Sequence, residues 1–219
     1  MPSNATFKPI FSPSRDHEDP NYNVANNFSC FPIYLLPVPF PPMPASDQGT
    51  SSDRYTLIPR TLIFLTRGDF ILLLRGGSHK RLWANQYNGI GGHIERGEDI
   101  LTAARRELSE ETGLAIEDLW LCGVITVDVG ERPGILIFVL RGELDQDASL
   151  AEGRLVASPE GSLEWVSVSQ VYNLPLVEDL PTLLPRVLAA RRNCALIFAQ
   201  YAYHEDRLLI KFSDSPNPL

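Results

Sequence analysis

From residue 54 onward, short apolar runs alternate with turn residues, a pattern that predicts β-strands. Residues 55–66 and 69–75 predict two strands joined at Arg67-Gly68, a hairpin signal, and the unbroken apolar run 71–74 predicts a buried strand. Further strands are predicted over residues 119–129, 134–141, from 163 onward, 195–203 and 207–212.

Two segments have helical spacing instead. In residues 99–112, the apolar positions expected to share one face are Ile100, Leu101, Ala104 and Leu108. Gly113 is suited to the left-handed conformation that ends many helices, and residues 180–190 predict a second, shorter helix. Strands around two helices, without an internal repeat, indicate one domain of the α/β (α+β) class.

The first 52 residues differ in composition from the rest. They hold ten of the eighteen prolines, and proline supports neither helix hydrogen bonds nor strand ladders. We expect residues 1–52 to be a disordered extension, residues 53–213 to form the domain and residues 214–219 to be a disordered tail. Two alternatives stay open for the extension: a proline-rich docking ligand, or upstream sequence if translation starts at Met43.

The composition also limits which cellular compartments and which partners are expected. The apolar stretch 31–40 is too short to span a bilayer and is interrupted by proline, so no membrane anchor is predicted. A formal charge of −8 disfavours binding to duplex nucleic acid, which needs a basic surface. Cys30, Cys122 and Cys194 are odd in number and lack CxxC spacing, which favours a reduced, cytoplasmic compartment. Cys122 and Cys194 lie in apolar runs and are predicted to be buried.

Three glutamates in the first predicted helix suggest a chemical role. Glu107, Glu110 and Glu111 stand at i, i+3 and i+4, which places their carboxylates on one helical face. Like charges this close repel, although an ordinary solvent-exposed acidic face is the common alternative. A divalent cation such as Mg²⁺, or Mn²⁺, removes the repulsion because it prefers oxygen ligands, and it also binds substrate phosphate.

The residues that flank the glutamates favour a cation site over an ordinary exposed acidic face. They follow the pattern G-x5-E-x7-R-E-U-x-E-E-x-G-U, in which U is a bulky aliphatic residue. The matching positions are Gly92, Glu98, Arg106, Glu107, Leu108, Glu110, Glu111, Gly113 and Leu114. On these residues the chain resembles the Nudix hydrolase family. The resemblance implies an α-β-α sandwich with a mixed sheet and a glycine-rich loop that leads into the catalytic helix.

The resemblance also implies a role for each motif position. The implied metal ligands are the backbone carbonyl of Gly91 and the side chains of Glu107, Glu110 and Glu111. The implied supporting positions are Gly92, Glu98, Arg106 and Gly113. An ion pair between Glu98 and Arg106 would orient the metal-binding face, whereas a simple surface salt bridge would contribute little. Water would attack phosphorus while the metal ion lowers the pKa of that water.

A general base and a substrate pocket are implied outside the motif. Family members take the base from the helix glutamates or from an acid on a later loop, and Glu160 stands where one branch carries such an acid. Asn88 resembles the base-contacting asparagine of the branch that hydrolyses oxidised purine nucleoside triphosphates. Glu178 and Asp179 resemble the acidic pair that reads the purine edge there. Each has an alternative: a turn residue for Glu160, an Asn-Gly turn for Asn88, and helix capping for the acidic pair.

The hypothesis from sequence is a Mg²⁺-dependent enzyme that cuts a diphosphate linkage in a small nucleotide. We expect an oxidised purine nucleotide such as 8-oxo-dGTP as substrate, with the monophosphate and pyrophosphate as products. An ADP-ribose or nucleotide-sugar diphosphatase is the enzymatic alternative. A Nudix-like module that senses a nucleotide without cutting it is the alternative from another class. The sequence leaves the number of metal ions and the oligomeric state open.

Overall fold

The computed structural model describes residues 48–49, 54–130, 133–145, 160–205 and 207–213. The elements of the unit from Ser51 to Leu219 are β1 (Leu57–Arg67), β2 (Phe70–Gly76), β3 (Tyr87–Asn88), α1 (Ile100–Thr112), β4 (Leu119–Asp128), β5 (Gly134–Leu144), β6 (Gly161–Ser167), η2 (Val171–Asn173), α2 (Leu180–Ala189), β7 (Ile197–His204) and β8 (Arg207–Phe212). The predictions for residues 1–47 and 214–219, including those for Cys30 and Met43, lie outside the described residues. Within the described ranges, every helix is too short or too polar to cross a membrane.

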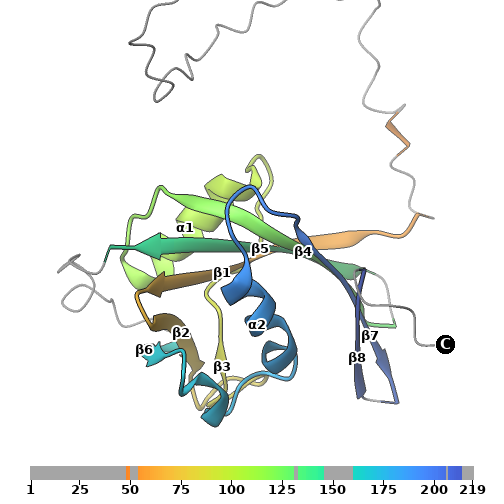
Figure 1. Cartoon of the computed structure of the whole chain (residues 1–219). Helices are drawn as coiled ribbons and strands as arrows, with labels where there is room; N and C mark the ends of the chain where they lie inside the picture. The colour runs from red at the N-terminus through yellow and green to blue at the C-terminus, as the bar shows by residue number, and fades with distance from the viewer. Residues whose placement is uncertain (1–47, 50–53, 131–132, 146–159, 206, 214–219) are drawn as a thin grey trace, which may run out of the picture. The chain divides into compact units, whose positions relative to one another are not determined.

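The strands form one mixed sheet (Figure 1). β1 and β2 make the predicted antiparallel hairpin, with Leu65 opposite Leu72. β1 then pairs in parallel with β5, and β4 pairs in parallel with β7, while the remaining ladders are antiparallel. The strand order is β3-β2-β1-β5-β4-β7-β8, with β6 paired to β2.

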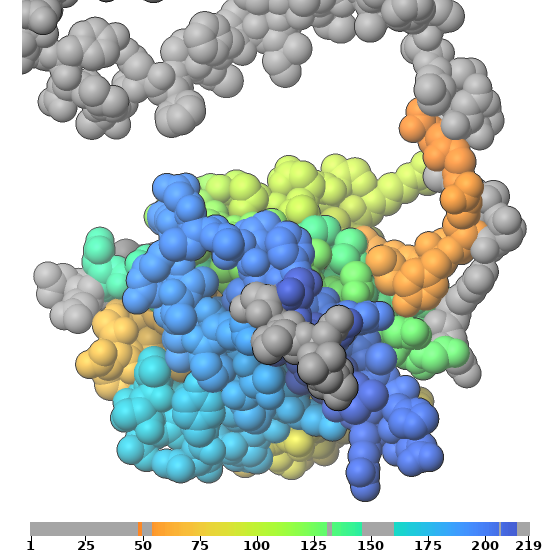
Figure 2. Space-filling view, turned by 45° about the vertical axis from the view of Figure 1, so that its right-hand side comes forward, coloured from red at the N-terminus to blue at the C-terminus, as the bar shows by residue number. Residues whose placement is uncertain are grey.

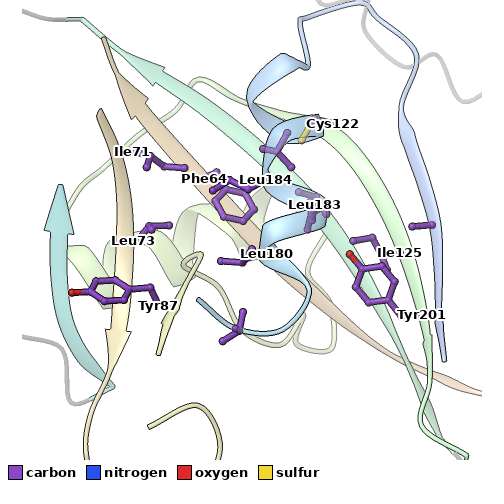
Figure 3. Packing of buried hydrophobic residues seen from close by; sticks show 14 of the residues in the cluster. Phe64, Ile71, Leu73, Tyr87, Cys122, Ile125, Leu180, Leu183, Leu184 and Tyr201 are labelled. Carbon is purple, nitrogen blue, oxygen red and sulfur yellow. The ribbon is translucent and has the colours of Figure 1, made fainter. Parts of the chain in front are cut away.

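The two helices cover opposite faces of this sheet. Side chains alternate along a strand, so Phe64 of β1 points to one face and its neighbours Ile63 and Leu65 point to the other. Phe64 packs in the cluster that contains Leu180, Leu183 and Leu184 of α2 (Figure 3). Ile63 and Leu65 pack with Ala104 and Leu108 of α1. Figure 2 shows α2, in blue, beside β6 and η2, in cyan, on the face of the molecule turned towards the viewer. The predicted α-β-α sandwich is confirmed.

Two predicted burials are wrong. Leu101 is 36% exposed, although helical spacing places it on the same face as Leu108, and Ala103 is buried beside Ala104. Cys194 is exposed in the turn before β7, whereas Cys122 is buried in β4 as expected.

A buried arginine ties α2 to the sheet. Arg141 of β5 donates from Nη1 to the carbonyl oxygens of Val187 at 3.1 Å, Leu188 at 2.8 Å and Ala190 at 2.8 Å. Its Nη2 pairs with Glu143 at 2.7 Å. Burial lowers the pKa of Arg141, but carbonyls at a helix C-terminus carry partial negative charge and suit a cation.

We therefore expect Arg141→Met to lower the free energy of unfolding by about 2–4 kcal/mol, because it removes a charged donor from three carbonyls. Chemical denaturation measures the loss. Glu143→Gln is the matched control, since it removes the exposed partner and leaves the carbonyl contacts in place. Equal losses in the two variants would contradict this role.

Candidate active site

The glycine-rich turn is held against β1 by backbone contacts. Thr61 N donates to Gly92 O at 2.9 Å, and Ile63 exchanges hydrogen bonds of 2.6 and 3.1 Å with Ile90. Gly91 has a φ of 148°, and a Cβ there would lie 2.2 Å from the carbonyl oxygen of Thr61. Only glycine fits this position, because the turn lies directly against the backbone of β1.

Helix α1 begins and ends as predicted. Asp99 caps its N-terminus by accepting from Leu101 N at 2.8 Å and Thr102 N at 3.0 Å. Gly113 ends it with a φ of 74°. The two caps fix where α1 begins and ends, and so they fix the positions of its glutamates along the helix axis.

The three motif glutamates have different surroundings. Glu111 is buried, with 8% of its surface exposed, and the Glu107 side chain is 14% exposed. The Glu110 side chain is 61% exposed. Residues four apart point in similar directions on a helix, so Glu107 and Glu111 both face the protein while Glu110 points towards solvent.

Glu111 is the most buried of the three motif glutamates. Burial raises its pKa to about 7, and the charges of Glu160 and Glu107 add to the effect. A backbone hydrogen bond from Gly91 and the charge of Lys80 oppose it. Its Oε2 is buried without a hydrogen-bond partner among the described residues. An unpartnered buried carboxylate oxygen is an available site for a cation.

Arg106 organises the acidic residues on the outer side of α1. Its Nε and Nη2 bind Glu98 at 2.7 and 2.9 Å, which lowers the Glu98 pKa to about 2. Its Nη1 contacts Glu107 at 2.9 Å and Glu110 at 3.2 Å, and its Nη2 also donates to the His93 carbonyl at 3.0 Å. The predicted Glu98–Arg106 ion pair is present, and Arg106 is more than a surface partner because it joins the turn to the helix.

A cavity of about 550 Å³ unites the motif with most of the other predicted residues. The predicted site residues along its wall are Asn88, Gly91, Gly92, Glu107, Glu111, Glu160, Glu178 and Asp179. Glu110, Glu98, Arg106 and Gly113 do not line it. The cavity therefore extends from the metal-type carboxylates to the second acidic pair.

Asn88 makes the predicted Asn-Gly turn and also lines the cavity. Its Oδ1 accepts from Gly89 N at 2.8 Å, as an Asn-Gly turn predicts. Its side chain also belongs to the cavity wall, on the segment that continues into the glycine turn.

The acidic pair, Glu178 and Asp179, precedes α2 and lines the same cavity. Asp179 occupies the helix N-cap position, but its side chain makes no capping hydrogen bond. Burial raises the pKa of Asp179, while its interaction with the Tyr201 hydroxyl lowers it. Glu178 Oε1 accepts from Leu208 N at 3.3 Å. Side-chain capping therefore does not explain Asp179, and both acidic residues line the cavity.

Glu160 lies at the turn that opens β6. Its carboxylate forms an ion pair with Lys80, and its carbonyl accepts from Gly77 N at 2.9 Å. Its charge is the second-largest cause of the raised Glu111 pKa. Glu160 thus combines the turn role with a position near the buried motif acid.

Several cavity residues were not predicted from the sequence. Arg60 stands on β1, Trp83 on the loop after β2 and Tyr203 on β7. Trp83 has a φ of 60°, unusual for a bulky residue, and is 48% exposed; Tyr203 is also 48% exposed. The polar break that Arg60 makes in an apolar strand was the one available signal for it.

The donor set fits a hard divalent cation. Within the described ranges, no three His, Cys, Asp or Glu side chains already surround one point, and Arg106 pairs with two of the glutamates. Yet carboxylate and carbonyl oxygens are the ligands such cations prefer, and Glu111 offers a buried oxygen without a partner. A Cβ at Gly92 would lie 2.5 Å from both Glu107 oxygens, so glycine leaves room for that carboxylate.

Residues 56–187 match the family described as NUDIX domain. The chain belongs to the Nudix family. An oxidized purine nucleoside triphosphate hydrolase of Danio rerio is 31% identical over 133 residues, which cover 60% of this chain and 80% of the relative. A Nudix relative of Salmonella typhi, an NAD-capped RNA hydrolase, is 29% identical over 142 residues, covering 64% of this chain and 48% of the relative.

Solved structures agree with this assignment. The MutT protein of Bacillus halodurans is 26% identical, with a TM-score of 0.61, and the match covers 73% of this chain and all of that one. The protein is therefore a Nudix hydrolase that acts on pyrophosphate bonds, and members of this family generally use a divalent metal ion.

Proposed function

We propose that the protein hydrolyses oxidised purine nucleoside triphosphates, such as 8-oxo-dGTP, to the monophosphate and pyrophosphate with Mg²⁺, or Mn²⁺, as cofactor. The observation that carries the proposal is the single cavity that joins Glu107 and Glu111 to Asn88, Glu178 and Asp179. A nucleotide needs both ends, one for its charged phosphates and one for its base. The similarity to the oxidized purine nucleoside triphosphate hydrolase of Danio rerio supports the same substrate class.

The phosphate end is formed by α1 and the glycine turn. Glu107, Glu110, Glu111 and the Gly91 carbonyl would hold the metal ion, and the bound ion would polarise the phosphate and lower the pKa of the attacking water. Arg106 and Glu98 keep the carboxylates oriented through the ion pairs at 2.7–3.2 Å.

The reaction needs a group that accepts the proton of water. Glu160 is proposed for this role because its carboxylate lies on the cavity wall and interacts with Glu111. The water oxygen bonds to phosphorus, the phosphorus–oxygen bond between the α- and β-phosphates breaks, and the proton passes to Glu160. Pyrophosphate is the leaving group when attack is at the α-phosphorus.

The base end is proposed to bind the purine edge through the two acidic side chains. Glu178 and Asp179 supply acceptors for ring and amino N–H groups, and Asn88 contributes its amide. Tyr201 lines the cavity from β7, where burial raises its pKa and the charge of Asp179 adds to the effect.

A panel of substrates tests this assignment. We expect kcat/KM for 8-oxo-dGTP to exceed that for ADP-ribose and for NAD-capped RNA by about tenfold or more, and Asp179→Asn to reduce the preference. Higher kcat/KM for ADP-ribose would overturn the substrate, and nucleotide binding without any turnover would indicate a sensor.

A further inference from the structure

A single arginine in the cavity has no partner in the described part of the protein. Arg60 lines the cavity, and its Nε is buried without a hydrogen bond. No ion pair or aromatic contact of Arg60 occurs within the described ranges. A buried donor without an acceptor is costly, and a guanidinium can only donate. The unmet need of Arg60 is therefore for an oxygen or nitrogen acceptor on a ligand.

The strand places Arg60 at the base end of the cavity. Alternate residues of β1 share a face, so Arg60 points with Leu62 and Phe64 towards the α2 side. Thr61 points to the other side, where α1 packs. Arg60 thus lies on the same side of the sheet as the acidic pair that precedes α2, and on the opposite side from the helix that carries the motif glutamates.

The floor beside Arg60 is apolar. In the parallel ladder Arg60 is opposite Ile137, and Ile135 and Val127 are opposite each other in the next row. All three aliphatic residues line the cavity. A flat hydrocarbon surface suits a planar ring and contributes no hydrogen bonds to a phosphate chain.

The polar groups around this floor are of two kinds. Glu178 and Asp179 provide acceptors at the α2 end, and Arg60 provides donors on β1. A ring that matches both must donate from one edge and accept at another. A guanine-type oxopurine does so, because its N1–H and amino group donate while its carbonyl oxygens accept. An aminopurine without a carbonyl offers Arg60 a weaker, ring-nitrogen acceptor only.

We propose that Arg60 is a specificity-determining residue that donates to a carbonyl oxygen of an oxopurine base and thereby selects against purines that lack this oxygen. The proposal rests on the assignment of the base end in the proposed function. It deepens that function by naming the group that separates oxopurines from aminopurines.

Binding of nucleoside monophosphates tests the proposal without requiring catalysis. Calorimetry would compare dGMP and 8-oxo-dGMP with the deoxymonophosphates of adenine and 2-aminopurine, for the wild type, Arg60→Met and Arg60→Lys. The sugar and phosphate are the same throughout, so only the base changes. Arg60 is half-buried, and Arg60→Met removes its buried Nε donor, which has no partner among the described residues, so thermal unfolding should occur at or above the wild-type temperature.

The expected result is a loss of binding affinity that is confined to the two oxopurine nucleotides. Arg60→Met should weaken their binding by about 10- to 100-fold and change the two aminopurines by less than about twofold. Arg60→Lys should recover part of the loss because it keeps a donor. A similar loss for all four ligands would place Arg60 at the phosphate and overturn the proposal, as would no loss for any of them.

The experiment distinguishes a failure of the proposed reaction from a failure of the proposed role of Arg60. If the wild type shows the selective binding but does not hydrolyse 8-oxo-dGTP, the reaction is wrong and the role of Arg60 stands. If the wild type binds none of the four monophosphates, the base end is wrong and the role of Arg60 fails with it.

Discussion

Glu111→Gln is expected to reduce kcat by roughly 100-fold or more with any diphosphate substrate, because it removes the buried carboxylate beside Gly91 and Glu107. The change is isosteric, so the cavity keeps its shape. Steady-state kinetics over a range of Mg²⁺ concentrations measures the loss. Wild-type rates at any metal concentration would show that the metal site is wrongly assigned.

The same substitution is expected to stabilise the metal-free protein above neutral pH. The folded pKa of Glu111 is about 7, above the ordinary value of 4.5, so the folded state binds the proton more tightly than the unfolded state. Stability due to this group is therefore present below about pH 4.5 and is lost as pH rises through 7. Glutamine removes that loss.

Unfolding in the presence of a chelator measures this effect. At pH 8 Glu111→Gln should be more stable than the wild type by up to about 3 kcal/mol, and the difference should shrink towards zero at pH 5. Glu110→Gln is the matched control, because it makes the same chemical change on the same helix at an exposed side chain. A stability difference that does not change with pH would contradict the burial of a charged Glu111.

Gly92→Ala is expected to reduce mainly activity, whereas Gly91→Ala is expected to reduce stability. At Gly92 the new Cβ meets only the end of the flexible Glu107 side chain, at 2.5 Å, so the carboxylate must move. We expect kcat to fall by about 10- to 100-fold while the free energy of unfolding changes by less than about 1 kcal/mol.

At Gly91 the obstacle is backbone, because the Cβ would lie 2.2 Å from the Thr61 carbonyl oxygen at a φ of 148°. Gly91→Ala should therefore lose at least about 2 kcal/mol of stability. Kinetics and denaturation of the two variants check the contrast. Equal destabilisation by both, or full activity of Gly92→Ala, would show that Glu107 is not held as described.

Much of this architecture was predictable because local pattern dictates it. The β1–β2 hairpin follows from two apolar runs around Arg67-Gly68, and α1 follows from its apolar spacing between Asp99 and Gly113. Strand β8 begins and ends where its alternation does. The motif residues needed only their spacing to be placed on one helix.

The remaining features depend on contacts between distant segments. The sequence presents Glu107, Glu110 and Glu111 as equivalent, and only packing of α1 on the glycine turn buries Glu111 and exposes Glu110. The role of Arg141 depends on the C-terminus of α2, which lies 46 or more residues later in the chain, packing against β5. Arg60 and the acidic pair line the same cavity. Strand pairing between distant segments brings them there, and no local pattern predicts it.

Phosphorus NMR of the products of 8-oxo-dGTP hydrolysis addresses the proposed reaction in one experiment. With Mg²⁺, the wild type should release 8-oxo-dGMP and pyrophosphate in equal amounts, and neither Glu111→Gln nor the chelated wild type should release them at a comparable rate. Release of orthophosphate with a diphosphate product, or undiminished turnover by Glu111→Gln, would contradict the assignment of bond and site.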